Sequence, residues 1–207
     1  NYVDYFLVCE SIYDHRGNLK KPNFIFKDEY DKNKIKYILL EKPFPKNTNR
    51  WENQALQREF IIENLDFALP EDLIFFSDPD EIIRPELLIN FELKKKYGIF
   101  LQDCFNYKLN LFNPYESPWE GTRVVKKMNL KSINFMRQKI LTKNLKYSFL
   151  RIDKERSIQI VENAGWHFNN LMSPKDISLK LKTFAHKEFS GKEFSSEEVI
   201  RDKIEKK

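Results

Sequence analysis

The chain has 207 residues, of which 32% are charged and 41% are hydrophobic, and its formal net charge is +5. This composition fits one domain with a buried core, and no apolar run approaches the ~18–20 residues of a membrane span. The mild positive charge suits a phosphate-bearing ligand and is too small to indicate a nucleic-acid partner, so we expect none. Because Cys9 and Cys104 both lie in apolar segments, we expect buried thiols rather than a disulfide framework.

Predicted strands and a helix follow one another in the N-terminal part of the chain. Apolar runs predict strands at residues 3–9, 35–40 and 73–76. Apolar positions at helical spacing predict a helix from about residue 50 to 67. Strands joined through a helix are typical of α/β proteins, so we expect an α/β domain whose central sheet is mostly parallel and contains these three strands.

The C-terminal part continues with further helices and strands. We expect a helix from Pro85 to Gly98, a strand over 101–112, a short strand at 123–125, a helix over 132–144, a strand at 157–161, and helices from about 173 and 195. In the strand over 101–112, alternation places Gln102 on the exposed side and Phe105 on the buried side. We expect one catalytic domain over residues 1–207, with the helices from about 173 packing on it.

The run Leu73–Phe76 ends abruptly in Asp78, Pro79, Asp80 and Glu81, which we call the acidic turn. In an extended segment Asp78 and Asp80 point to the same side. Two carboxylates that close repel each other unless a cation lies between them, and Mn²⁺ and Mg²⁺ prefer such oxygen ligands. Ligands of α/β sheets also bind where strands end. The sequence therefore predicts a metal site here, with a solvated acidic turn as the alternative.

Two other polar positions follow predicted strands. Glu10 and Ser11 end the first strand, where they would meet a ligand or form a capped turn. His167 lies between Trp166 and Phe168, near the C-terminal end of the chain. A histidine in such a setting is either a core residue or a member of a site.

Three segments together resemble family 17 glycosyltransferases, the β-1,4-mannosyl-glycoprotein N-acetylglucosaminyltransferases that add the bisecting GlcNAc to N-glycans. The segments are Val3 to Ser11, Glu71 to Ile82, and Gly165 to Phe168, the last followed by Ser173-Pro174 and Lys180-Leu181. Their order and spacing span nearly the whole chain.

The resemblance implies a GT-A-like, Rossmann-type fold, a UDP-sugar donor such as UDP-GlcNAc, a glycan or glycoprotein acceptor, and inversion at the anomeric carbon. It also implies a divalent metal cofactor, Mn²⁺ or Mg²⁺. The chain departs from the family pattern after the acidic turn, where Ile82-Ile83 replaces Ile-Pro, and it lacks the C-terminal extension of the animal enzymes. Because of these departures, the resemblance specifies the identity of the donor more closely than that of the acceptor.

The resemblance and the chemistry of the leaving group together suggest roles for the metal-site residues. A bound divalent cation stabilises the charge that develops on the departing diphosphate. We expect Asp80 to bind the metal directly. Asp78 would reach the ribose, or the metal through water, and His167 would complete the metal or diphosphate site.

Donor-binding candidates come from several segments. Glu10 and Ser11 would face the uridine or the sugar, and Trp166 is either a core residue or a platform for the sugar. Arg84 and Lys180 are candidates for binding phosphate, with a solvated surface charge as the alternative for each.

Inversion requires one general base that takes the proton of the acceptor hydroxyl. Glu81 is the first candidate because it adjoins the predicted metal site. Glu120 and Glu10 are alternatives.

Two other functions compete with the glycosyltransferase. A metal-dependent nuclease is suggested by Pro79-Asp80 followed by Glu92-Leu93-Lys94, a loose PD-(D/E)xK pattern, but that chemistry needs Glu92 and Lys94 on a strand rather than in the predicted helix. A non-catalytic carbohydrate-binding module is suggested by the aromatic content of 14%.

The cellular location is not indicated by the sequence. Members of the resembled family typically reside in the Golgi lumen, but no targeting segment opens this chain. The chain begins at Asn1 rather than Met, which suggests a fragment from which an upstream anchor could have been lost.

Overall fold

The computed structural model describes residues 2–183 and 191–205, and the chain divides into two compact units. The first unit comprises residues 3–65 and the chain from residue 172 onward, and the second comprises residues 66–171. Each unit is defined by its internal contacts, so the single catalytic domain over 1–207 stays a prediction. Among the described residues, no helix is long and apolar enough to cross a membrane.

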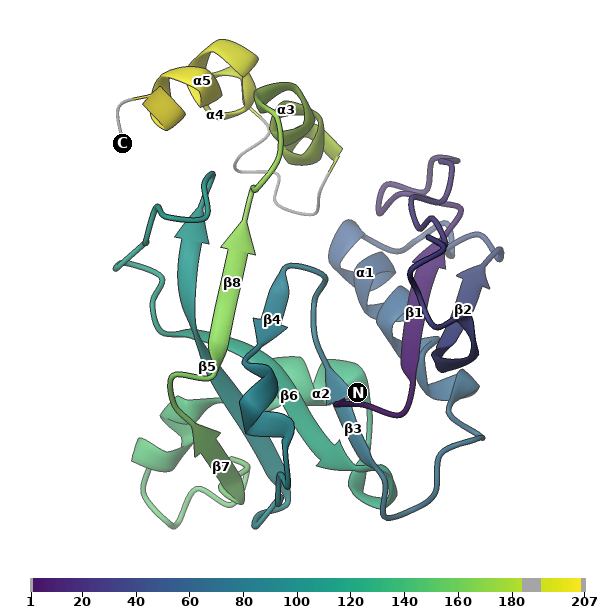
Figure 1. The fold of residues 1–207 in the computed structure, drawn as a ribbon, viewed down its shortest axis with the longest axis vertical. Coiled ribbons are helices and arrows are strands. Elements are labelled where there is room, and N and C mark those ends of the chain that lie inside the picture. Colours follow the sequence, from purple (N-terminus) through teal and green to yellow (C-terminus); the bar gives the residue numbers. More distant parts are fainter. Residues whose placement is uncertain (1, 184–190, 206–207) are drawn as a thin grey trace. The chain divides into compact units, whose positions relative to one another are not determined.

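The first unit contains a two-stranded parallel sheet. Strand β1 (Phe6–Ser11) pairs with β2 (Ile35–Leu40) along its whole length, and helix α1 (Arg50–Glu59) contacts β1 (Figure 1). The bounds of β2 are those predicted, whereas β1 begins at Phe6 and extends through Ser11, and α1 ends well before residue 67. After α1 the chain continues in a short 3-10 turn at Ile62–Asn64.

A local sequence signal sets the start of α1. At the start of α1, the Asn49 side chain accepts hydrogen bonds from the backbone N–H groups of Trp51 and Glu52, and the Glu52 carboxylate accepts one from Asn49 N–H. This capping box satisfies donors that the helix leaves without partners.

The C-terminal helices pack against one another. They are α3 (Pro174–Thr183), α4 (Lys192–Ser195) and α5 (Glu197–Glu205). The predicted start after Ser173 is confirmed, because the Ser173 hydroxyl accepts from Asp176 N–H at 3.2 Å. Their packing onto a catalytic domain stays a prediction.

The second unit is built on a curled, mixed six-stranded sheet in the order β3-β6-β5-β8-β4, with β7 also paired to β5. The strands are β3 (Leu73–Phe76), β4 (Glu81–Ile83), β5 (Tyr97–Asn106), β6 (Trp119–Lys126), β7 (Ile158–Val161) and β8 (Gly165–Asn169). The central strand β5 pairs antiparallel with β6 along one edge. Along its other edge β7 and then β8 pair with it in parallel (Figure 1).

The prediction of a mostly parallel sheet was wrong. The pairs β3–β6, β5–β6 and β4–β8 are antiparallel, and within the described residues β3 pairs with β6 rather than with β1 or β2. For β5 and β6 the physical reason lies in their connection, since a parallel crossover is usually made by a helix. Residues 107–118, which join these two strands, form a loop without a helix, and the chain returns antiparallel to β5. A Rossmann-type arrangement is therefore not confirmed.

Two predicted elements in this unit were also wrong. The expected helix from Pro85 to Gly98 is a 3-10 turn at Pro85–Leu88, followed by irregular backbone and the start of β5. The expected strand over 101–112 ends at Asn106, and Gln102 is buried rather than exposed. Strand β5 lies in the middle of the sheet and is covered on both faces. A polar residue such as Gln102 can therefore be buried there, although the alternation of polar and apolar residues predicted that it is exposed.

One part of the core of the second unit forms between the sheet and the segment that precedes β5. Phe100, Val124 and Ala164 are fully buried. The partly buried residues packed against them are Leu73, Phe75, Ile83, Leu87, Phe91, Leu93 and Val161.

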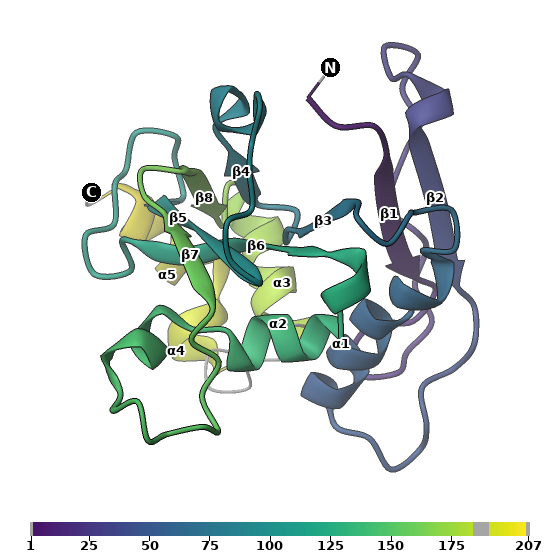
Figure 2. The ribbon, with the colours of Figure 1, turned by 90° about the horizontal axis from the view of Figure 1, so that it is seen from below.

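Helix α2 (Ile133–Lys139) covers the β5–β6 part of the sheet, where the Phe135 ring lies 6.0 Å from the Tyr97 ring (Figure 2). Ser132 caps α2 by accepting from Phe135 N–H at 2.9 Å. The predicted helix over 132–144 is thus present but shorter, and a 3-10 turn at Thr142–Lys146 follows it.

Candidate functional site

The acidic turn connects β3 to β4 and lies beside β8. Its backbone closes through Glu81 N–H, which donates to Asp78 O at 3.0 Å. Antiparallel pairing then places Glu81 opposite His167. Phe168 N–H also donates to Asp80 O at 2.8 Å. These backbone contacts bring two segments that are distant in the sequence to one place.

Asp80 and His167 are the residues of the predicted metal site that meet most directly. Asp80 Oδ1 lies 3.7 Å from His167 Nδ1, which is too long for a hydrogen bond. His167 is buried, and its Nδ1 has no hydrogen-bond partner among the described residues. The Trp119 ring stacks on the imidazole at 4.5 Å between centroids and 9° between planes. A buried polar atom without a partner is costly, so this nitrogen indicates a place where a ligand can bind.

Arg137, on α2, is a member of the site that the sequence reasoning missed. Its Nη2 donates to Asp78 Oδ2 at 2.7 Å and its Nη1 to Glu81 Oε1 at 3.1 Å. Burial alone would lower the pKa of Arg137, but the charges of Asp78 and Glu81 outweigh it and raise that pKa above its usual value. Arg137 thus supplies positive charge to two carboxylates of the acidic turn.

The Glu81 side chain is fully buried, and both of its oxygens are engaged. Oε1 accepts from Trp119 Nε1 at 3.0 Å as well as from Arg137, and Oε2 accepts from Asp78 N–H at 3.1 Å. These bonds fix the shape of the acidic turn. For Glu81 to act as the predicted base, at least one of them would have to open.

Glu120, the alternative base on β6, is held by a different set of contacts. Its Oε2 accepts from Arg123 Nη2 at 3.1 Å, and its Oε1 accepts from the N–H of Thr142 at 2.9 Å and from the Thr142 hydroxyl. Burial lowers the pKa of Arg123 to about 10, and the charge of Arg137 acts in the same direction. Glu120 therefore ties the chain after α2 to β6.

Trp166 and Arg84 contact each other on the other face of the β4–β8 pair. The guanidinium carbon of Arg84 lies 4.4 Å from the centre of the Trp166 ring, and Arg84 Nε donates to Asn163 O at 2.8 Å. Because successive residues of a strand point to opposite faces, Trp166 points away from the side that carries His167. The two predicted donor contacts are therefore paired with each other in this structure.

The remaining predicted donor residues belong to the first unit. The Glu10 carboxylate accepts from the N–H groups of Asn23 and Phe24 at 2.8 Å each and from the Tyr37 hydroxyl at 3.0 Å. Burial works to raise the pKa of Glu10, but these hydrogen bonds together lower it below its usual value. Ser11 is buried and accepts from a backbone N–H two residues on. Lys180 lies on α3.

A divalent cation at the acidic turn would need several oxygen or nitrogen ligands. Within the described ranges, no group of three His, Cys, Asp or Glu side chains converges closely enough to hold a metal by itself. Asp80 and His167 offer an oxygen and an unpartnered nitrogen, which fits a cation that takes its other ligands from water and phosphate. The residues present therefore fit a metal that binds together with a diphosphate.

The nuclease alternative needs Glu92 and Lys94 on a strand beside Asp80. In the structure both lie in irregular backbone before β5.

Comparison of the chain with protein-family models, with curated proteins and with solved structures found no match.

Proposed function

We propose that this chain is an inverting, metal-dependent glycosyltransferase that moves a sugar, with GlcNAc the first candidate, from a UDP-sugar to a glycan acceptor. The observation that carries the proposal is the position of Asp80, which follows a strand and lies 3.7 Å from the buried, unpartnered Nδ1 of His167. The three segments that resemble family 17 glycosyltransferases contain both residues. A carbohydrate-binding module would not need this arrangement.

Asp80 and His167 would hold the cation, Mn²⁺ or Mg²⁺. When bound, such a cation neutralises negative charge on a diphosphate leaving group. Trp119 fixes the plane of the His167 ring by stacking on it, so the direction of Nδ1 is set before any ligand arrives. A preorganised group of this kind costs little reorganisation during a reaction.

Arg137 and Asp78 have complementary tasks in this proposal. The guanidinium of Arg137 forms a planar fork that suits carboxylate or phosphate, and it lies within the same cluster as the acidic turn. It holds Asp78 through one oxygen and so orients that carboxylate for a ribose hydroxyl or a metal-bound water. Arg137 would also add positive charge beside the diphosphate of the donor.

The proton of the acceptor hydroxyl must pass to a base during inversion. Glu81 stays our first candidate by its position in the acidic turn, and its role would require the hydrogen bond from Trp119 or Arg137 to open on substrate binding. Without such opening, Glu81 is a positioning residue. A Glu81→Gln variant separates these roles, because loss of a base lowers kcat without preventing UDP binding.

The direct test is a transfer assay with the purified chain, UDP-GlcNAc, Mn²⁺ and a panel of glycan acceptors. We expect release of UDP together with a glycan product whose mass has increased by one sugar. EDTA should abolish the reaction, and a GDP-sugar should not replace the donor. Tight binding of a GDP-sugar without binding of UDP would overturn the donor assignment. Cleavage of labelled DNA with Mg²⁺, without any turnover of nucleotide sugar, would favour the nuclease instead.

A further inference from the structure

The segment of residues 139–156 runs from the last residue of α2 towards β7 and is rich in basic residues. It contains six Lys or Arg residues and two acidic residues, so it carries a net charge of +4. We call this segment the basic loop. It lies in the second unit, after the helix that carries Arg137.

The basic loop also exposes large apolar side chains at its turn. Phe149, Leu150 and Ile152 are 80%, 73% and 96% exposed, and we call these three residues the apolar tip. Hydrogen bonds from Arg151 N–H to Ser148 O at 3.0 Å and from Ile152 N–H to Leu150 O at 3.0 Å hold the backbone in tight turns. Neighbouring apolar side chains that stay in water are unfavourable and mark an interaction site.

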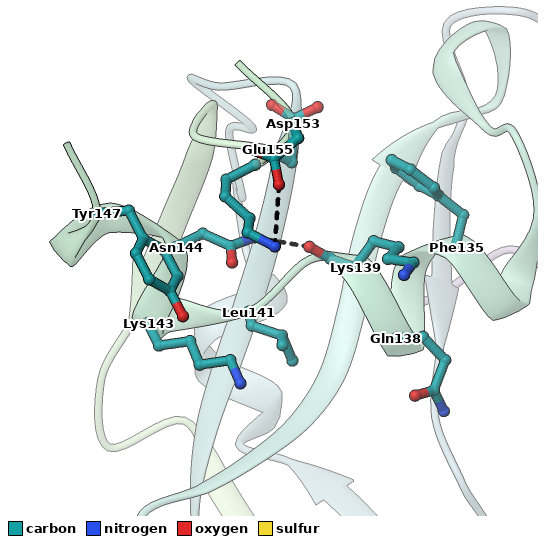
Figure 3. Close-up of a pocket in the computed structure, with 10 residues that line it drawn as sticks. Phe135, Gln138, Lys139, Leu141, Lys143, Asn144, Tyr147, Asp153 and Glu155 are labelled. Atoms are coloured by element: carbon teal, nitrogen blue, oxygen red, sulfur yellow. Dashed lines mark hydrogen bonds and ion pairs between the residues drawn. The ribbon is translucent and has the colours of Figure 1, made fainter. Parts of the chain in front are cut away.

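A cavity of about 470 Å³ lies between α2 and the basic loop. The residues that line it include Lys139, Lys143, Asn144 and Tyr147 and also the carboxylates of Asp153 and Glu155 (Figure 3). Within the part of the chain that the structure describes, neither Lys139 nor Lys143 forms an ion pair. Their ammonium groups are therefore available to an anionic group that approaches this surface.

The acidic residues of the basic loop are already engaged locally. Asp153 accepts from Arg151 Nε and Nη2 at 2.7 and 2.9 Å, and Lys154 Nζ lies 3.2 Å from it. The carboxylate of Glu155 accepts from the N–H groups of Arg156 and Ser157. Asp153 thus compensates the charges of Arg151 and Lys154, whereas Lys139 and Lys143, which also border the cavity, form no ion pair among the described residues.

We propose that the basic loop docks the protein onto an anionic lipid surface, with the apolar tip in the interfacial layer and Lys139, Lys143 and Lys146 facing lipid phosphates. Apolar side chains flanked by lysines suit a membrane interface, where burial of apolar area and attraction to anionic headgroups act together. Each basic side chain near such a surface typically contributes roughly a fivefold gain in affinity. Single-stranded nucleic acid would instead call for aromatic stacking surfaces, whereas two of the three tip residues are aliphatic.

The test is flotation of the full chain with lipid vesicles. We expect binding to vesicles rich in phosphatidylglycerol and no binding to pure phosphatidylcholine. The binding should weaken strongly when salt is raised to about 1 M, where charges are screened over ~3 Å. Equal binding to both kinds of vesicle, or to neither, would overturn the proposal.

Two double variants separate the apolar and ionic contributions. Leu150→Ser with Ile152→Ser, and Lys139→Glu with Lys143→Glu, should each lower the vesicle partition coefficient by at least about tenfold. The matched controls are Ile89→Ser with Leu109→Ser, at residues 58% and 63% exposed in the same unit, and Lys94→Glu with Lys95→Glu. The controls should bind vesicles like the wild type, and thermal unfolding should show that all four variants are folded.

Two results would identify a different role for this surface. Unchanged vesicle binding in the tip variant would exclude insertion of the apolar tip. A wild-type protein that self-associates in sedimentation, and loses this association in the tip variant without any change in vesicle binding, would assign the surface to a second copy of the chain.

Discussion

Asp80 Oδ1 and His167 Nδ1 lie 3.7 Å apart because one strand register joins their segments. Glu81 pairs with His167, and Ile83 pairs with Gly165, so the acidic turn is aligned with β8 by backbone pairing rather than by the side chains themselves. A change that shifts this register should therefore separate Asp80 from His167 without touching either residue.

Gly165→Ala tests this dependence. Gly165 has φ of +142°, and a Cβ there would lie 2.0 Å from Ile82 O in the facing strand. We expect the β4–β8 pairing to shift, the free energy of unfolding to fall by about 1–3 kcal/mol, and UDP binding with Mn²⁺ to weaken. Urea denaturation and calorimetry measure the two effects.

Gly17→Ala is the matched control for Gly165→Ala. Gly17 also has positive φ, at +88°, but a Cβ there meets nothing within 4 Å. In Gly17→Ala the free energy of unfolding should fall by about 1 kcal/mol, because only the unfavourable positive φ contributes. UDP binding should be normal. If Gly165→Ala cost no more than Gly17→Ala, the close approach of the two strands would not be what positions the acidic turn.

Arg137→Met should destabilise the second unit. The substitution keeps much of the side-chain volume but leaves the buried carboxylate of Glu81 and the carboxylate of Asp78 without their cation. Breaking a buried ion pair typically costs about 3–5 kcal/mol. Urea denaturation measures this loss, and Arg137→Lys should recover only part of it because lysine lacks the planar fork.

Arg201→Met supplies the comparison for Arg137→Met. Arg201 pairs with Glu197 on α5, but both side chains are about half exposed. An exposed pair four residues apart on a helix contributes about 0.3–0.5 kcal/mol, so this variant should remain close to the wild type. Similar losses in Arg137→Met and Arg201→Met would show that the Arg137 cluster is effectively solvated.

Cys104 should make stability fall at alkaline pH. Burial, a hydrogen bond to the Glu116 carboxylate and the charge of that carboxylate raise the pKa of Cys104 from 9.0 to about 12. The folded state therefore favours the neutral thiol, and this contribution is complete below pH 9.0 and is lost as pH rises towards 12.

Urea denaturation between about pH 8 and pH 10.5 measures the effect of Cys104. The free energy of unfolding should fall more steeply with pH in the wild type than in Cys104→Ala. Iodoacetamide should also modify Cys104 slowly in the folded protein and readily in urea, because the thiolate is the reactive form. Parallel pH profiles of wild type and variant would show that the thiol ionises equally easily in both states.

Residue patterns predicted the bounds of individual strands better than they predicted which strands pair with each other. The bounds predicted for residues 35–40 and 73–76 match those of β2 and β3, because each is a short apolar run bounded by polar or turn residues. Strand order depends on contacts between distant segments, which periodicity does not report. Gln102 shows the same limit, since a polar residue in a central strand looks exposed in the sequence but is buried here.

The candidate site was predictable only in part. The acidic turn and His167 could be found because they lie in short segments with recognisable residue types. Arg137 and Trp119 could not, since nothing in their local sequence distinguishes them from other helix and strand residues. Their contacts with Glu81 arise from the packing of α2 and β6 around the turn.

The central claim is that Asp80 holds a divalent cation that binds the diphosphate of a UDP-sugar. It is tested most directly by calorimetry of UDP binding, with Mn²⁺ or with EDTA, to wild type and to Asp80→Asn. Asparagine keeps the shape of the side chain and removes its charge, so the fold should survive. Asp153→Asn, at an exposed carboxylate in the basic loop, is the control. We expect UDP binding that requires Mn²⁺ in wild type and in Asp153→Asn, loss of that binding in Asp80→Asn, and transfer reduced by at least roughly 10²-fold. Equal UDP affinity with Mn²⁺ and with EDTA, unchanged in Asp80→Asn, would contradict the claim.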